Sequence, residues 1–255
     1  MSVPARALPS PDADVAELVS RLGDFKTRLA GVKGGISGIP FYPYDTLGSL
    51  NQLDRLLTGN HRKLHRLAAG LPIADIGAAD GDLAFFLETQ GFDVHIIDNA
   101  PTNMNGLRAA RAVAQALGSK VAVHDIDLDS QFALPQERYG LVLFLGILYH
   151  LKNPYYAMEK LAQRAQYMAL STRVAQIAKP LTAPPRPNGV RQLVGELINR
   201  YLVPPRTPEG MTRIAGLPVA YLVDEKECNN DSTNFWMFTN EGLKRLLNRC
   251  GWDVV

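Results

Sequence analysis

The sequence predicts an α/β fold in which a doubly wound, mostly parallel sheet carries helices on both faces. Five short apolar runs lack the polar alternation of half-exposed strands, which is typical of strands buried on both sides. Segments with helical spacing of apolar residues accompany these runs, and alternating strands and helices indicate a parallel sheet. We expect strands at 73–76, 93–97, 121–124, 140–145 and 166–171, and helices at about 81–90, 103–117, 154–164 and 240–250.

A helical cap precedes the first strand. Apolar residues recur on one helical face in its first segment, at Val15, Leu18, Val19, Leu22, Phe25 and Leu29. The later part of the cap contains glycines, aromatic residues and bases. In chain order we expect a disordered lead at 1–14, a helix from Val15 to Leu29, a flexible glycine loop at 31–38, an aromatic turn at 40–45, a helix at 47–57 and a basic segment at 61–66.

A long segment after the fifth strand breaks the alternation of strands and helices. Residues 172–218 hold eight of the 17 prolines and seven bases against two acids, a net charge of 7 − 2 = +5. Long insertions of this kind are often lids or binding loops, although a solvated decoration is equally compatible. We expect one short helix within it, at about 189–201.

The chain therefore divides into four predicted segments. These are an N-terminal helical cap at 1–66, the sheet core at 67–171, a basic Pro-rich lid insertion at 172–224 and the C-terminal part of the core at 225–255. Trp252–Val255 is interpreted as the start of a further strand.

Composition restricts the class of protein. The 255 residues are 46% hydrophobic, enough for a large core, and the net charge of +2 permits a polyanionic partner without implying one. Cys228 and Cys250 have no metal-binding or disulfide spacing, which favours a reducing, cytoplasmic compartment. The N-terminus has no apolar signal core, and no apolar run is long enough to span a bilayer.

A glycine turn after the first strand is the most informative motif. It runs from Asp75 through Gly77, Ala78 and Ala79 to Gly81. Glycines let the backbone approach a ligand at the end of a buried strand. The dinucleotide pattern G-x-G-x-x-G fails here, and the chain contains no phosphate-binding G-x-x-x-x-G-K-[ST].

The remaining pattern, D-x-G-x-x-x-G, resembles motif I of the class I S-adenosylmethionine (SAM) methyltransferases. Ala79 replaces the middle glycine of that motif, which costs little unless the position needs a positive φ. The resemblance implies a Rossmann-like fold, SAM as cofactor and S-adenosylhomocysteine (SAH) as product. It also implies a last antiparallel strand, so either the sheet is one strand short or the sequence is truncated. The implied cofactor-binding residues are Asp75, Gly77, Ala78, Ala79, Gly81, Asp98, Asn99, Asp125, Ile126 and Gly146.

Acids end the second and third predicted strands. Asp98 is expected to bind the ribose hydroxyls, with a helix N-cap as the structural alternative. In the family an acid after the third strand takes the adenine amino group. Asp125 is the predicted counterpart, although Asp127 and Asp129 lie close in sequence.

The segment after the fourth strand is where a class I enzyme presents side chains to the transferred methyl group. His150 is a candidate general base, and Tyr149 a candidate for catalysis or for lining the acceptor pocket. A capping loop with a structural histidine is the alternative for both residues.

The stretch Gly146-Ile147-Leu148-Tyr149-His150 with Asn153-Pro154 is similar to that of the tRNA wobble-uridine methyltransferase-like family, which builds 5-oxyacetyl or 5-methoxy groups on uridine 34. Lys33-Gly34 and the segment from Asn234 to Thr239 resemble further parts of it. This resemblance implies acceptor-binding roles for Lys33, Tyr149, Asn234 and Trp236.

The acceptor is open between tRNA and a small metabolite methylated on oxygen or nitrogen. A non-catalytic module that binds SAM or RNA is the alternative to an enzyme. The polar residues Glu225, Glu227 and Asp231 match no metal loop, and no metal is expected.

Overall fold

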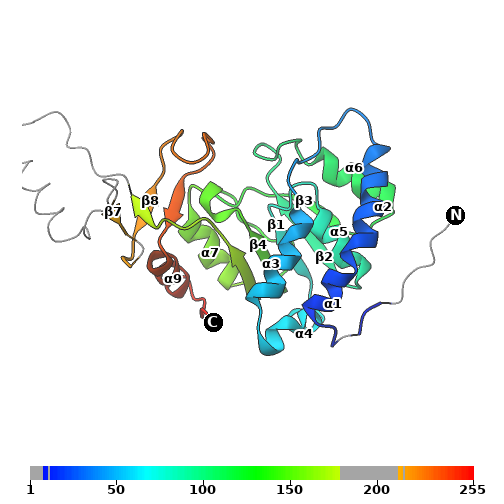
Figure 1. The fold of residues 1–255 in the computed structure, drawn as a ribbon, viewed down its shortest axis with the longest axis horizontal. Coiled ribbons are helices and arrows are strands. Elements are labelled where there is room, and N and C mark those ends of the chain that lie inside the picture. Colours follow the sequence, from blue (N-terminus) through cyan, green and yellow to red (C-terminus); the bar gives the residue numbers. More distant parts are fainter. Residues whose placement is uncertain (1–7, 11, 179–211, 215) are drawn as a thin grey trace, which may run out of the picture. The chain divides into compact units, whose positions relative to one another are not determined.

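A five-stranded parallel sheet forms the centre of the fold in the computed structural model, which describes residues 8–10, 12–178, 212–214 and 216–255 (Figure 1). The strand order is β3-β2-β1-β4-β5. The predicted Rossmann-like α/β architecture is confirmed. The strands are β1 Ile73–Ile76, β2 Val94–Asp98, β3 Ala122–Asp125, β4 Tyr139–Leu145 and β5 Ala165–Ser171.

The chain reverses direction across the sheet beside β1. Ile73 pairs with Val94 of β2 on one side and with Leu141 of β4 on the other. The chain runs outward from β1 to β3 and then returns to β4 on the opposite side. Ligands of such sheets bind where this switch occurs, at the carboxyl ends of the strands. The turn after β1 and the segment after β4 are therefore the expected binding edge.

Helices precede and follow β1. The earlier elements are α1 Val15–Ser20, α2 Leu22–Gly34, η1 Thr46–Gly48, α3 Ser49–Leu56, η2 Gly59–Arg62 and α4 Leu64–Ala68. The later ones are α5 Asp82–Thr89, α6 Arg108–Leu117, η3 Leu148–His150, α7 Pro154–Ala162 and α9 Asn240–Arg249. Helix α5 packs against β2, α4 packs against β4 and β5, and α2 contacts both α5 and α6.

Helix α5 is the most deeply buried helix near the glycine turn. Its residues Leu83 to Leu87 are all buried, because the helix lies between the sheet and α2. Phe86 meets Phe25 of α2 edge-on, with ring centroids 5.5 Å apart. The contact joins the N-terminal helices to the element that begins at the turn.

The predicted helix from Val15 to Leu29 is two helices, because α1 ends at Ser20 and α2 begins at Leu22, and two further boundaries also differ. Helix α2 continues to Gly34, through part of the segment predicted to be a flexible loop. Glycine in a helix costs about 1 kcal/mol relative to alanine, and burial of Phe25 and Leu29 outweighs that cost. Helix α6 begins at Arg108 rather than 103, because the Asn103 side chain accepts hydrogen bonds from the backbone N–H groups of Asn105 and Leu107.

The predicted C-terminal strand is wrong. Trp252–Val255 forms no strand. The indole Nε1 of Trp252 donates to the Met158 carbonyl (3.0 Å), and the backbone N–H of Trp252 donates to the Leu247 carbonyl (3.0 Å).

Two antiparallel strand pairs were not predicted. They are β6 (Ile177–Ala178) with β7 (Thr212–Arg213), and β8 (Ala220–Leu222) with β9 (Trp236–Phe238). The predicted helix at 189–201 and most of the lid insertion lie outside the described residues.

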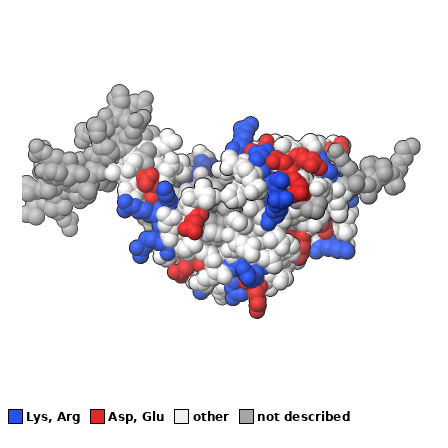
Figure 2. All heavy atoms as spheres, turned by 90° about the horizontal axis from the view of Figure 1, so that it is seen from below, with Lys and Arg blue, Asp and Glu red and all other residues white. Residues whose placement is uncertain are grey.

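The chain forms two compact units. The first comprises residues up to 147 together with 160–171, and the second comprises 148–159 with the described part of 172–255. The four-segment domain division stays a prediction. Basic and acidic side chains intermix on the face shown in Figure 2, in keeping with the small net charge.

Candidate functional site

The glycine turn after β1 has a backbone that only glycine fits at two positions. Gly77 and Gly81 have φ of +64° and +84°. A Cβ on Gly77 would lie 2.3 Å from Cδ1 of Ile147, and one on Gly81 would lie 2.5 Å from Cδ1 of Ile96. The positive φ favours glycine at both positions, and a Cβ there would displace the ends of the Ile147 and Ile96 side chains.

Ala79, at the middle of the turn, also has a positive φ, of +54°. A left-handed conformation costs roughly 1–2 kcal/mol for a residue with a Cβ. The substitution for glycine in the motif is therefore not free. Two hydrogen bonds offset this strain: the Ala79 N–H donates to Asp98 (3.2 Å), and its carbonyl accepts from Asn103 (3.2 Å).

Asp98 ends β2 and faces the turn. Its carboxylate accepts hydrogen bonds from the N–H groups of Ala79 and Asn99 and from the Asn103 amide, at 3.2, 2.8 and 3.0 Å. Burial raises the pKa of this carboxyl group, and the three donors oppose that effect. Of about four lone-pair positions on a carboxylate, three are used. The fourth suits a ligand hydroxyl.

Asp75 lies in the middle of β1 and is 5% exposed. Burial, together with the charge of Asp98, raises its pKa to about 7, although a hydrogen bond from the Ala84 N–H opposes both effects. Asp75 therefore ties β1 to the first turn of α5.

The remaining predicted cofactor residues lie at neighbouring strand ends of the same unit. Asp125 pairs with Asp98 across the β2–β3 ladder, and its carboxylate accepts from the Ala100 N–H (2.8 Å). The Ile126 N–H donates to the Asp98 carbonyl (2.9 Å), and the Gly146 N–H donates to Ser171 (2.9 Å). The structure thus brings the strand ends β1, β2, β3 and β4 together within one unit.

This arrangement fits a nucleoside. Asp98 and Asp125 stand side by side at the sheet edge, and the Ala79 N–H of the turn donates to Asp98. Carboxylates at this edge suit ribose hydroxyls and an adenine amino group, both of which donate hydrogen bonds.

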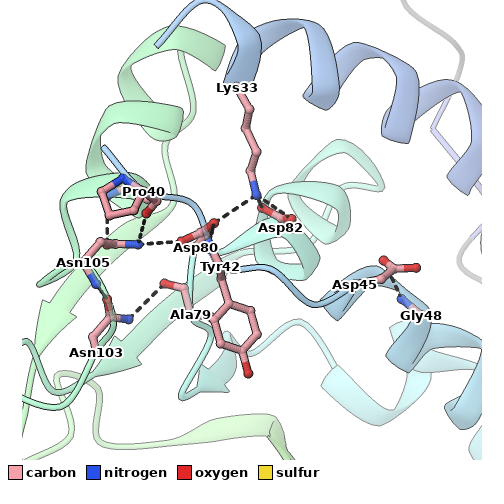
Figure 3. A network of polar contacts seen from close by, with 11 residues as sticks. Lys33, Pro40, Tyr42, Asp45, Gly48, Ala79, Asp80, Asp82, Asn103 and Asn105 are labelled. Carbon is pink, nitrogen blue, oxygen red and sulfur yellow. Dashed lines mark hydrogen bonds and ion pairs between the residues drawn. The ribbon is translucent and has the colours of Figure 1, made fainter. Parts of the chain in front are cut away.

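Sequence reasoning missed the residues that brace the turn. Asp80 is 2% exposed, and its carboxylate accepts from the Asn105 amide at 2.8 Å (Figure 3). Asn103 and Asn105 were assigned to a helix. The available signal was two asparagines just before a helical segment, which is typical of side chains that bind nearby backbone.

His150, a predicted catalytic residue, lies in the second unit, in η3. Its Nδ1 stands 3.0 Å from the Thr233 carbonyl, and a carbonyl can only accept, so Nδ1 carries the proton and Nε2 has a free lone pair. Thr233 in turn donates to Asp231 (2.6 Å). Burial lowers the pKa of His150, so the ring is neutral at pH 7.

Tyr149 lies beside Arg173 in the same unit. The guanidinium carbon is 5.2 Å from the Tyr149 ring centroid, and Nη1 donates to Cys228 Sγ (3.5 Å). The Asn229 amide oxygen, turned toward Arg173, accepts from Nη1 and Nη2 at 3.0 and 2.9 Å. A hydrogen bond with Tyr149 is the largest cause of the raised Arg173 pKa. The guanidinium is held as a fixed positive charge next to Tyr149 and His150.

The other predicted acceptor residues bind protein groups. Asn234 is 3% exposed and donates to the carbonyls of Cys228 and Asp231, and Trp236 Nε1 donates to the Lys152 carbonyl (3.2 Å). These bonds shape the loop that supports His150. Lys33 lies in the first unit. The acceptor-binding roles of these residues stay predictions, as do the catalytic roles of Tyr149 and His150.

The described part of the chain offers neither a metal cluster nor a membrane-spanning helix. No group of three or more His, Cys, Asp or Glu side chains among the described residues could hold a metal ion. Within the same part of the chain, no helix combines the length and apolarity that crossing a membrane requires.

A family model described as a methyltransferase domain matches residues 50–255. A comparison with curated proteins returned no match.

Among solved structures, the S-adenosylmethionine dependent methyltransferase of Mesorhizobium loti is 18% identical, with 82% of each chain covered and a TM-score of 0.48. The N-terminal domain of EvdMO1 with SAH bound is 15% identical, over 89% of this chain and 86% of the other, at a TM-score of 0.46. The PH0226 protein of Pyrococcus horikoshii OT3 is 15% identical over 80% of each chain, with a TM-score of 0.44. All three scores are below 0.5, and the family assignment rests on the family model.

Proposed function

The chain belongs to the methyltransferase-domain family, and on this premise we propose that SAM binds the turn from Gly77 to Gly81 with its ribose on Asp98 and its adenine beside Asp125. The observation that carries this proposal is the strained turn bonded to the acid at the end of β2. Bound SAM supplies an electrophilic methyl group on a sulfonium. The protein residues supply position, a proton acceptor and charge.

His150 is the proposed general base. Its Nε2 lone pair takes the proton of an acceptor hydroxyl or amine as that atom attacks the methyl group. Thr233 and Asp231 hold the ring in the tautomer this role needs. Burial lowers the His150 pKa below the ordinary histidine value of about 6.5, so the ring stays unprotonated when the pH falls to that value. Activity should therefore fall only at a pH below about 6.5.

The fixed charge of Arg173, beside Tyr149 and His150 in the same unit, favours an acceptor that carries an anionic group. Three side chains already hold the guanidinium, so little conformational entropy is lost when it binds a carboxylate or phosphate. The uridine at position 34 of tRNA fits this chemistry through its phosphates, as does a small acidic metabolite methylated on oxygen or nitrogen. The motif at 146–154, which resembles the wobble-uridine family, adds support for the tRNA acceptor.

Methyl transfer from radiolabelled SAM tests the function. Purified protein is incubated with total tRNA or with fractionated small metabolites, and label is followed into each fraction. His150→Gln should lower turnover roughly 10²–10⁴-fold at unchanged SAH affinity. Asp98→Asn should weaken SAH binding roughly tenfold or more, since it loses charge-assisted hydrogen bonds. Glu137 is an exposed acid of the same unit as Asp98, and Glu137→Gln serves as the control for SAH binding.

The results separate the candidate functions. Label in tRNA, with binding that weakens steeply as salt rises, supports the wobble-uridine acceptor. Label only in a metabolite fraction supports the small-molecule acceptor. Tight SAH binding with no label in any fraction contradicts an enzyme and leaves a non-catalytic SAM-binding module.

A further inference from the structure

Asp80 joins three segments that are distant in the sequence. Its carboxylate accepts a hydrogen bond from Lys33 Nζ of α2 (3.1 Å), from the Tyr42 N–H (2.8 Å) and from the Asn105 side chain before α6 (2.8 Å) (Figure 3). The partners lie 47, 38 and 25 residues away along the chain. A buried carboxylate with this many partners is a fixed anchor, because losing any of them leaves charge poorly solvated.

A second set of contacts fixes the same segment from both sides. Lys33 Nζ lies 2.8 Å from the Asp82 carboxylate and 5.0 Å from the ring centroid of Phe41. Asn105 donates to the Pro40 carbonyl as well (3.2 Å). The segment from Pro40 to Tyr42 is therefore held by Asn105 at one end and by Asp80 at the other.

The anchor lies within the glycine turn itself. Asp80 follows Ala79, which bonds to Asp98, and precedes Gly81, the N-cap residue of α5. Figure 3 shows the Tyr42 side chain leaving the network on the side opposite Lys33. Tyr42 as a residue is 36% exposed although its backbone is anchored, and one edge of its ring packs against Tyr44 with centroids 5.3 Å apart. The anchored backbone with a partly open ring is the geometry of a segment that can cover a ligand at the turn.

We propose that Asp80 is a positioning residue for the cofactor, which fastens the segment from Lys33 to Tyr42 onto the glycine turn as a cover. The inference rests on the proposed SAM site. Lys33 acts in it as the counter-ion that holds the cover, and Tyr42 as the side chain that shields the bound cofactor. A cover slows escape of the ligand more than its entry, so its removal shows mainly in the dissociation rate.

SAH binding kinetics provide the test, with SAH as the probe. Asp80→Asn and Tyr42→Ala are expected to raise the SAH dissociation rate, Asp80→Asn roughly tenfold or more and Tyr42→Ala by a smaller factor. Lys33→Met should raise it as well. In the SAH complex of Asp80→Asn, amides at 36–45 should exchange hydrogen faster than in the wild-type complex.

Asp14→Asn is the matched control. Asp14 caps α1 and pairs with Arg62 (2.6 Å), so its loss destabilises the same N-terminal helices without touching the turn. It should lower the unfolding temperature and leave SAH dissociation unchanged. If Asp14→Asn speeds dissociation as much as Asp80→Asn at equal loss of stability, Asp80 is merely structural and the proposal is overturned.

Three further outcomes are decisive. If the SAH dissociation rate of Tyr42→Ala is within about twofold of the wild-type rate, the proposed cover is refuted. This holds even if Asp80→Asn does not fold. Wild-type protein that fails to bind both SAM and SAH refutes the proposed function instead. Binding by wild type with unchanged rates in all three variants refutes only this inference.

Discussion

Asp75 and Asp98 are buried acids that raise the cost of folding. Each has a pKa raised by burial, and the charge of Asp98 raises that of Asp75. Groups with perturbed pKa values cluster at functional sites, because a ligand there recovers the cost. In the cofactor-free protein these two side chains oppose stability.

The stability cost of Asp75 should depend on pH. Its pKa is about 3.8 in the unfolded chain and about 7 in the folded one, so the folded state binds the proton more tightly. Stability from this group is therefore full below about 3.8 and falls as pH rises to about 7. Asp75→Asn should be more stable than wild type at pH 8, with a gap that shrinks toward pH 5. Urea unfolding at both pH values measures it, and a constant gap contradicts the pKa assignment.

The turn between β1 and α5 combines strain with close packing. Gly77 and Gly118 share a φ of +64°, but only Gly77 has a neighbour within 4 Å of a Cβ position. The pair therefore separates the two costs in one protein.

Separate alanine substitutions at Gly118 and Gly77 compare the cost of the positive φ with the cost of close packing. Gly118→Ala should lose about 1 kcal/mol of unfolding free energy, the usual penalty of a left-handed alanine. Gly77→Ala should lose a further 1–3 kcal/mol or so from overpacking against Ile147, and Ile147→Ala in the same chain should restore part of it. Equal losses at the two glycines, measured by urea unfolding, would show that the contact with Ile147 relaxes freely.

Two histidines connect β2 and β3, His95 three residues before Asp98 and His124 directly before Asp125. His124 Nε2 and His95 Nδ1 are 3.1 Å apart, and the rings stack with centroids 5.1 Å apart. One nitrogen must donate and the other accept, which requires at least one neutral ring. Burial lowers the pKa of both, and His95 lowers that of His124 further.

This pair should make the β2–β3 edge sensitive to acid. The unfolded chain takes up protons near pH 6.5 while the folded pair resists, so stability falls as pH drops from about 6.5 toward the lowered folded pKa values. Wild type should lose more unfolding free energy than His124→Asn between pH 7.5 and 5.5. His61→Gln leaves the pair intact and should follow wild type; a wild-type loss no larger than that of His124→Asn contradicts the prediction.

At the scale of the whole molecule, the two units hold different parts of the proposed chemistry. All ten predicted cofactor residues belong to the first unit, whereas Tyr149, His150 and Arg173 belong to the second. Ligand binding stabilises the part of the protein that it contacts.

SAH should therefore protect the two units unequally. At 100 times its dissociation constant it contributes about 2.7 kcal/mol of stability. Hydrogen exchange should slow at 77–81, 98–103 and 125–126, and change less in β8 and β9. Mass spectrometry of peptides with and without SAH measures this. Stronger protection of β8–β9 than of the turn would place the cofactor elsewhere.

Sequence patterns were enough to predict the parallel sheet, its five strands to within one residue, the glycine turn and the acids at the ends of β2 and β3. These depend on local features, namely apolar runs, glycine positions and the residue types at the end of each strand. The folded chain alone shows that Asp80 anchors Lys33, Tyr42 and Asn105, that α2 extends to Gly34 and that Trp252 binds Met158 instead of starting a strand. Each of these depends on hydrogen bonds or packing between distant segments, and a buried polar group takes whichever partners the fold brings to it.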